Sequence, residues 1–151
     1  MKMRSRLLIA VSLLLLAACG AGDTGSSTTT SEPAVLVGDV TLTRSGGFAG
    51  FLTTVTVQED GVVVVVDNSD APRESVLPEA ELHTLHAMVT SAEFGGLLET
   101  YVPSEGVCCD FFFYEVTAVV GGRTIKSTTA DTIETPPILQ QVIDLLSGLM
   151  P

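Results

Sequence analysis

The sequence predicts an α+β domain in which an antiparallel sheet carries its helices on one face. Three observations support this fold class. Short β-branched and aromatic segments are separated by glycine turns over residues 40–66 and again over 111–128, and two longer segments repeat their leucines and valines at helical spacing. Helices with one apolar stripe are readily buried against one face of such a sheet. We therefore expect a sheet of four to five strands, one long helix after the third strand and a C-terminal helix.

The first three strands are expected in the N-terminal half. Residues 40–44 alternate apolar and polar side chains, and residues 51–57 resume this pattern after a glycine-rich segment. Asp60-Gly61 is a strong signal for a two-residue hairpin turn, and it leads into the unbroken valine run 62–66. Five exposed valines would aggregate, so we expect this strand to be covered on both faces or to be an edge protected by another segment.

The two helices are expected in the C-terminal half of the chain. Pro78 suits a first helical position, acidic residues follow it in the first turn, and Gly95-Gly96 would end this long helix. Pro136-Pro137 would open the second helix, with Thr135 as its predicted cap. Between the helices lie the last two predicted strands, residues 111–120 and 123–128.

The N-terminus has the pattern of a secretory signal. A basic head precedes an apolar run that is too short to span a bilayer, and Ala17-Ala18 precede Cys19. This resembles a bacterial lipoprotein signal, in which the cysteine is diacylated before cleavage. We therefore predict a signal peptide over residues 1–18 and lipidation of Cys19, which would anchor the protein to the extracytoplasmic face of a bacterial membrane. An ordinary signal peptide with a chance cysteine is the alternative.

A flexible tether is expected between the anchor and the folded domain. Residues 19–34 contain, after the cysteine, no aliphatic or aromatic residue larger than alanine, so they cannot bury a core. The folded domain is then predicted over residues 35–151.

The charge of the mature chain excludes some partners. Removal of Lys2, Arg4 and Arg6 with the signal would leave 4 Lys+Arg against 18 Asp+Glu, a net charge of −14. Such a surface repels phosphate backbones and anionic lipid headgroups. We therefore expect no nucleic-acid partner, and a membrane contact through the lipid alone.

Few residues of the chain point to catalysis. Glu79, His83 and His86 would share one side of the first helix and are zinc-ligand types, but their order is not that of the zinc peptidase motif and no fourth ligand suggests itself. Solvated positions on an exposed helix face are the simpler interpretation. The glycine segment 45–50 lacks the lysine and the following helix that phosphate binding needs. We expect no metal, no cofactor and no enzymatic activity.

Cys108 and Cys109 are the thiols that would remain after lipidation of Cys19. Adjacent Cα atoms lie about 3.8 Å apart, below the usual disulfide range of roughly 4.4–6.8 Å, so a bond between them would be strained. A vicinal disulfide, an intermolecular bridge and two buried thiols all remain open. The vicinal bond is slightly favoured, with a structural role.

A resemblance to a known family centres on the segment Thr43-Arg44-Ser45-Gly46-Gly47-Phe48-Ala49-Gly50. This segment closely resembles the opening motif of the emfourin family, small proteins that inhibit thermolysin-like zinc metallopeptidases. Looser similarities follow over residues 40–149, at Leu77-Pro78, Leu82, Leu85, Ala92-x-Phe94, Asp110-Phe111-x-Phe113-Tyr114-x-Val116, Pro137, Leu139 and Leu145. Members of that family are typically cytosolic and without cysteines, so the lipid anchor, the tether and the cysteine pair are departures from the family pattern.

The resemblance implies an inhibitor that occludes the active-site cleft of a secreted or envelope metallopeptidase. Such a peptidase keeps one zinc position open for water and substrate, and its cleft favours an apolar side chain beside the scissile bond. The candidate contact residues are Arg44, Ser45, Gly46, Gly47, Phe48, Ala49 and Gly50, with Phe48 as the apolar anchor.

Three alternatives remain open at this point. Phe48 could point into the core of a bulged hairpin. The contacting loop could instead be Asn68–Val76 or Glu99–Val107. The protein could also be a non-inhibitory structural or adaptor lipoprotein of the cell envelope. We expect a monomer.

The lipoprotein hypothesis predicts the behaviour of Cys19→Ala. Because the thiol carries the lipid, this variant should leave the membrane fraction or accumulate as unprocessed precursor, as measured by detergent partitioning of cell fractions. Cys108→Ala, which keeps the signal cysteine, should partition as the wild type does. Unchanged partitioning of Cys19→Ala would contradict the anchor.

Overall fold

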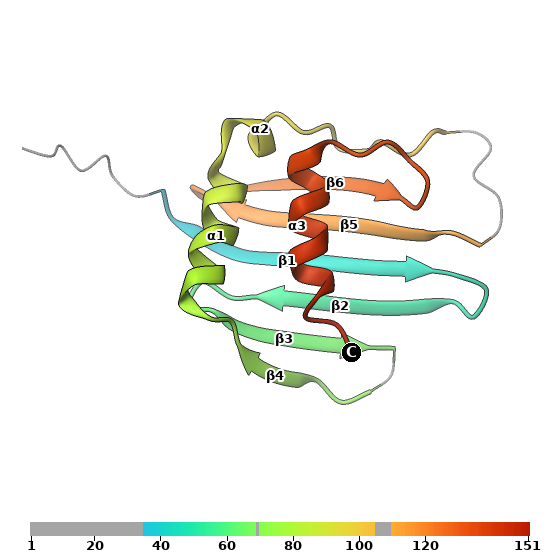
Figure 1. Cartoon of the computed structure of the whole chain (residues 1–151), viewed down its shortest axis with the longest axis horizontal. Helices are drawn as coiled ribbons and strands as arrows, with labels where there is room; N and C mark the ends of the chain where they lie inside the picture. The colour runs from blue at the N-terminus through green and yellow to red at the C-terminus, as the bar shows by residue number, and fades with distance from the viewer. Residues whose placement is uncertain (1–34, 69, 105–109) are drawn as a thin grey trace, which may run out of the picture. The chain divides into compact units, whose positions relative to one another are not determined.

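The computed structural model describes residues 35–68, 70–104 and 110–151, which form a six-stranded antiparallel sheet with helices on one face (Figure 1). Pro33–Pro151 is a compact unit of its own. The order of the strands in the sheet is β4-β3-β2-β1-β5-β6. The strands are β1 (Val37–Gly46), β2 (Phe51–Val57), β3 (Val62–Asp67), β4 (Arg73–Val76), β5 (Phe112–Val120) and β6 (Arg123–Ala130).

The helices are α1 (Glu79–Thr90), α2 (Ala92–Gly95) and α3 (Pro137–Ser147). Figure 1 shows α1 and α3 crossing the same face of the sheet, with α3 over its centre. The α+β class is therefore confirmed. Within the described ranges, no helix is long and apolar enough to span a bilayer.

The expected strand count is wrong, because the sheet has six strands and the first helix follows the fourth of them. The additional strand is β4, which pairs with β3 and lies within Asn68–Val76, a segment that the sequence predicts to be a loop. All four of its residues are exposed and two are charged. A short charged edge strand of this kind resists edge-to-edge aggregation but has no apolar alternation by which sequence could identify it.

The expected single long helix is interrupted at Ser91. The backbone of Ser91 is extended, its hydroxyl donates to the carbonyl of Met88 at 2.8 Å, and its oxygen accepts from the amide of Phe94 at 3.1 Å. Ser91 thus ends α1 and caps α2. The break turns the ring of Phe94 into the core, where it is fully buried.

The core lies between the two main helices and one face of the sheet. Along β3, Val63 and Val65 are buried while the alternate valines are half-buried on the other face. The sequence predicts that this valine run is either covered on both faces or a protected edge, and both predictions are wrong. β3 is not an edge, because it pairs with both β2 and β4, and the helices cover only one face of the sheet (Figure 1). The helices contribute the buried residues Leu85 and Val89 from α1, Phe94 from α2, and Leu139, Val142, Ile143 and Leu146 from α3.

The predicted cap of the second helix is also wrong. Pro136 occupies the N-cap of α3, and no side chain caps the helix. The hydroxyl of Thr135 lies 2.7 Å from that of Thr129 and so ties the loop before α3 to the end of β6. Two consecutive prolines set the start of the helix without a side-chain cap, because their fixed φ angle is close to the helical value.

Phe94→Ala should destabilise the domain more than any surface change beside it. Removal of a fully buried ring leaves a cavity, and the free energy of unfolding should fall by about 3–5 kcal/mol. The measurement is denaturant unfolding of the segment 33–151, which omits the predicted signal and anchor, with the exposed neighbour Glu93→Ala as control. Equal unfolding midpoints for the two variants would contradict the assigned core.

Candidate functional site

The segment that carries the family resemblance forms the hairpin between β1 and β2. Gly46 pairs with Phe51 at the end of the ladder, and the amide of Gly50 donates to the carbonyl of Gly47 at 3.0 Å, which closes the turn. At the tip, the side chain of Phe48 is 94% exposed. The alternative in which Phe48 enters the core is therefore wrong.

Two glycines let this hairpin lie tight against β5. Gly46 and Gly47 have φ angles of +117° and +67°, a region that favours glycine. A Cβ atom at Gly46 would collide with the carbonyl oxygen of Phe111, and one at Gly47 would lie 2.9 Å from the ring of Phe112. The backbone of the hairpin can approach β5 only because both positions lack a side chain.

The start of β5 supports one side of the hairpin. The amide of Gly47 donates to the carbonyl of Phe111 at 3.0 Å. The guanidinium carbon Cζ of Arg44 lies over the ring of Phe112, 5.0 Å from the centroid of that ring. The ring centroids of Phe112 and Phe51 are 6.3 Å apart. These contacts join both strands of the hairpin to β5, with a cation–π interaction at the base.

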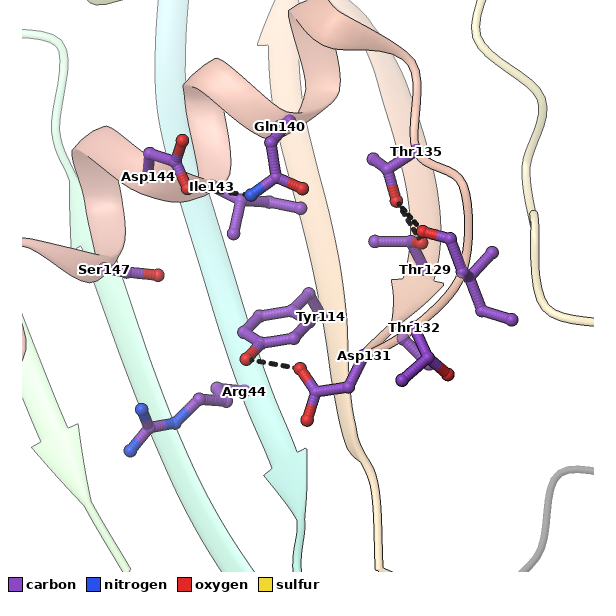
Figure 2. Close-up of a pocket in the computed structure, with 12 residues that line it drawn as sticks. Arg44, Tyr114, Thr129, Asp131, Thr132, Thr135, Gln140, Ile143, Asp144 and Ser147 are labelled. Carbon is purple, nitrogen blue, oxygen red and sulfur yellow. Dashed lines mark hydrogen bonds between the residues drawn. The ribbon is translucent and has the colours of Figure 1, made fainter.

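Asp131 fixes the start of β5 from the other side. Its carboxylate accepts from the amide of Phe112 at 3.1 Å and from the hydroxyl of Tyr114 at 3.0 Å. Figure 2 shows the Tyr114 hydroxyl directed at this carboxylate. Burial and the hydrogen bond to Asp131 raise the pKa of Tyr114, against the opposing charge of Arg44. The phenol therefore stays a hydrogen-bond donor at neutral pH.

The turn after β3 supports the other side of the hairpin. The amide of Asn68 donates to the carbonyl of Leu52 at 2.7 Å, and the side-chain oxygen of Asn68 accepts from the amide of Leu52 at 2.9 Å. Beside it, the hydroxyl of Thr53 donates to Asp67 at 2.8 Å. Asn68 has a φ of +46°, which is unusual for a residue other than glycine. This conformation, which asparagine adopts more readily than most residues, places the backbone amide and the side-chain oxygen of Asn68 on Leu52.

A polar pocket of about 350 Å³ lies beside the hairpin base, between α3 and the ends of β1, β5 and β6 (Figure 2). Arg44, Tyr114 and Asp131 form one wall, and Gln140, Asp144 and Ser147 of α3 another. Asp131 is engaged by β5, and Asp144 accepts from the side chain of Gln140 at 2.7 Å. Of these two carboxylates, Asp131 holds the start of β5 beside the hairpin base, whereas Asp144 is hydrogen-bonded within α3.

The other predicted site residues lie elsewhere. On α1, His83 Nε2 and Glu79 Oε1 are 3.6 Å apart and both side chains are largely exposed. Burial and the nearby His83 lower the pKa of His86, with Glu59 opposing. Within the described residues, no group of three or more His, Cys, Asp or Glu side chains is arranged to hold a metal ion. Cys19, Cys108, Cys109 and part of the alternative loop Glu99–Val107 fall outside the described residues.

Sequence reasoning identified the hairpin but missed the residues that hold it. Phe112, Asp131 and Asn68 act through strand pairing between distant segments, which no local pattern reveals. The one available signal was Asn68 in a short polar segment after a strand, since asparagine is among the residues that tolerate a positive φ.

Asn68→Ala should loosen the hairpin on one side. The change removes the acceptor for the Leu52 amide and leaves alanine in a left-handed conformation that costs roughly 1–2 kcal/mol. Hydrogen exchange of the Leu52 amide should become faster in this variant. Asn68→Asp, which keeps the acceptor oxygen and tolerates the conformation, should preserve protection, and equal exchange in both variants would contradict this role.

No protein-family model matches the chain, and no curated protein matches it.

Proposed function

We propose that this protein is an emfourin-like inhibitor of thermolysin-like zinc metallopeptidases, held at the cell envelope by a lipid on Cys19. The β1–β2 hairpin enters the active-site cleft of the peptidase, with Phe48 as its apolar anchor. The protein itself catalyses no reaction in this proposal, and its partner is a secreted or envelope metallopeptidase.

The observation that carries the proposal is the exposure of Phe48 on a braced loop. An aromatic side chain that is 94% exposed contributes nothing to the core. It stands on a hairpin that β5 holds through Gly47 and the β3–β4 turn holds through Leu52. A loop that is already ordered loses less entropy on binding, and aromatic residues are frequent among the side chains that dominate binding energy.

The chemistry of the target fits such a loop. Peptide hydrolysis at a catalytic zinc requires that the substrate carbonyl is oriented for attack by the zinc-bound water. A hairpin whose backbone hydrogen bonds are engaged at both flanks cannot distort toward that orientation, so it would fill the cleft without being cleaved. The turn hydrogen bond from Gly50 to Gly47 keeps the tip closed in the same way.

The surroundings of the domain are consistent with an envelope role. A net charge of −14 in the predicted mature chain would keep the domain off anionic headgroups, and the predicted tether of 14 residues from Gly20 to Pro33 would, as a random coil, have an end-to-end distance of about 20 Å. The lipid and tether would then place the inhibitor above the membrane, where secreted peptidases pass.

Phe48→Ala should weaken inhibition while leaving the fold intact. The soluble segment 33–151 should block cleavage of a peptide substrate by thermolysin at near-stoichiometric ratios without being degraded. Because Phe48 is exposed, its truncation should not lower the unfolding midpoint, whereas loss of an anchor of about 2 kcal/mol or more should raise the inhibition constant roughly 30-fold. The measurement is the inhibition constant from titrations at several enzyme concentrations.

Leu98→Ala is the matched control, because Leu98 is another large apolar side chain that is 62% exposed, beside β6 and away from the hairpin. It should inhibit as the wild type does. A folded wild-type segment that leaves thermolysin and related peptidases fully active would overturn the inhibitor proposal and favour the adaptor lipoprotein. Equal inhibition by Phe48→Ala would retain an inhibitor but reject this hairpin as its anchor.

A further inference from the structure

We infer that the peptidase contacts a second surface, the helix-free face of the sheet next to the hairpin. This inference rests on the proposed function and extends it from the tip to the body of the domain. The face consists of the residues of β1, β2, β3 and β5 that alternate with the buried core residues. It begins at Leu52 and Phe113, which lie on either side of Ser45 where the hairpin joins the sheet.

The hairpin tip alone is too small for a tight complex. A fully buried aromatic side chain contributes about 150–250 Å², whereas a stable interface buries about 800 Å² on each partner. Phe48 is 94% exposed and Phe51 43% exposed, so together they supply well under half of that area. Tight inhibition therefore requires a second contact surface that is continuous with the hairpin.

The centre of the helix-free face is uncharged, since it consists of threonine, serine and leucine residues of β1 and β2. Thr54 and Thr56 of β2 lie opposite Thr43 and Thr41 of β1, and the hydroxyls of Thr41 and Thr56 are 3.1 Å apart. Charged side chains lie around this centre: Glu74 of β4 lies opposite Val64, Glu115 and Lys126 form an ion pair of 2.7 Å, and Asp39 is exposed near the start of β1. Depletion of charge is typical of the core of an interface.

The same face is also rigid. Val64 and Val66 of β3 extend the threonine rows, opposite Thr56 and Thr54. Valine and threonine have stiff χ1 angles in strands, so they lose little side-chain entropy when a partner covers them. The half-buried valines of this face gain further burial from a partner.

The charge of the protein argues against a second copy as the occupant. Two predicted mature chains of net charge −14 repel each other, and anionic lipid is repelled as well. A peptidase whose cleft holds the hairpin has the rim of that cleft next to Leu52 and Phe113, at the start of this face. The occupant that we assign is therefore this rim.

Thr56→Arg tests the inference at the centre of the face, away from the hairpin tip. A long charged side chain there would hold the two surfaces apart, so the inhibition constant against thermolysin should rise at least tenfold. Thr84→Arg, the same substitution on the exposed side of α1, should leave inhibition unchanged. Thr117→Arg on β5, opposite Thr41, gives a second variant in case Thr56→Arg fails to fold, and thermal unfolding identifies the folded variants.

The possible outcomes separate the two proposals. If the wild type inhibits and a folded arginine variant of the face inhibits equally well, this inference is overturned while the inhibitory hairpin stands. If size measurements show a wild-type dimer that Thr56→Arg dissociates without change in inhibition, the occupant is a second copy and the inference is likewise overturned. If the wild type fails to inhibit, the proposed function and this inference fall together.

Discussion

The structure depends on the pairing of β1 with β5 at the centre of the sheet. β1 joins the meander β4-β3-β2 to the hairpin β5-β6, and it uses both edges of its backbone down to Gly46, which pairs with Phe51 on one side and Phe112 on the other. This pairing brings the two ends of the domain sequence together and aligns the sheet face on which α1 and α3 pack. The same pairing places β5 beside the base of the β1–β2 hairpin, so the tip protrudes from a base that is held by hydrogen bonds.

Much of this fold could be predicted from local patterns, and the misses have physical causes. The glycine pair at 121–122 and the apolar stripe of α3 lie within single segments and predict the right elements. Asp60-Gly61 predicts the hairpin between β2 and β3 correctly, but the two-residue turn is wrong, because the amide of Gln58 donates to the carbonyl of Val62 and leaves three residues between them. β4 escaped because an edge strand that avoids aggregation is polar by necessity. The break at Ser91 escaped because its cost is offset by the burial of Phe94, a tertiary contact.

The candidate site also has a part that local sequence predicts and a part that it does not. The glycines and Phe48 of the hairpin were evident from sequence and from the family resemblance, whereas its supports were not. Asp131 reaches Phe112 and Tyr114 across 19 and 17 positions of sequence, and Asn68 reaches Leu52 across 16. Their roles follow from strand register, which is fixed by the whole sheet and not by any window of residues. A search for reactive side chains does not identify Asp131 and Asn68, because these side chains accept hydrogen bonds from backbone amides and so position the backbone.

The surroundings of the exposed phenylalanine support a binding role. Single exposed apolar side chains are common on protein surfaces, but Phe48 shares its hairpin with the partly exposed Phe51 and Leu52. Two glycines with positive φ angles let the hairpin lie against β5, and Asn68 holds its other side. These residues stabilise the hairpin and limit the motion of its tip. Phe48 therefore projects from an ordered support, which is the arrangement that a rigid apolar anchor requires.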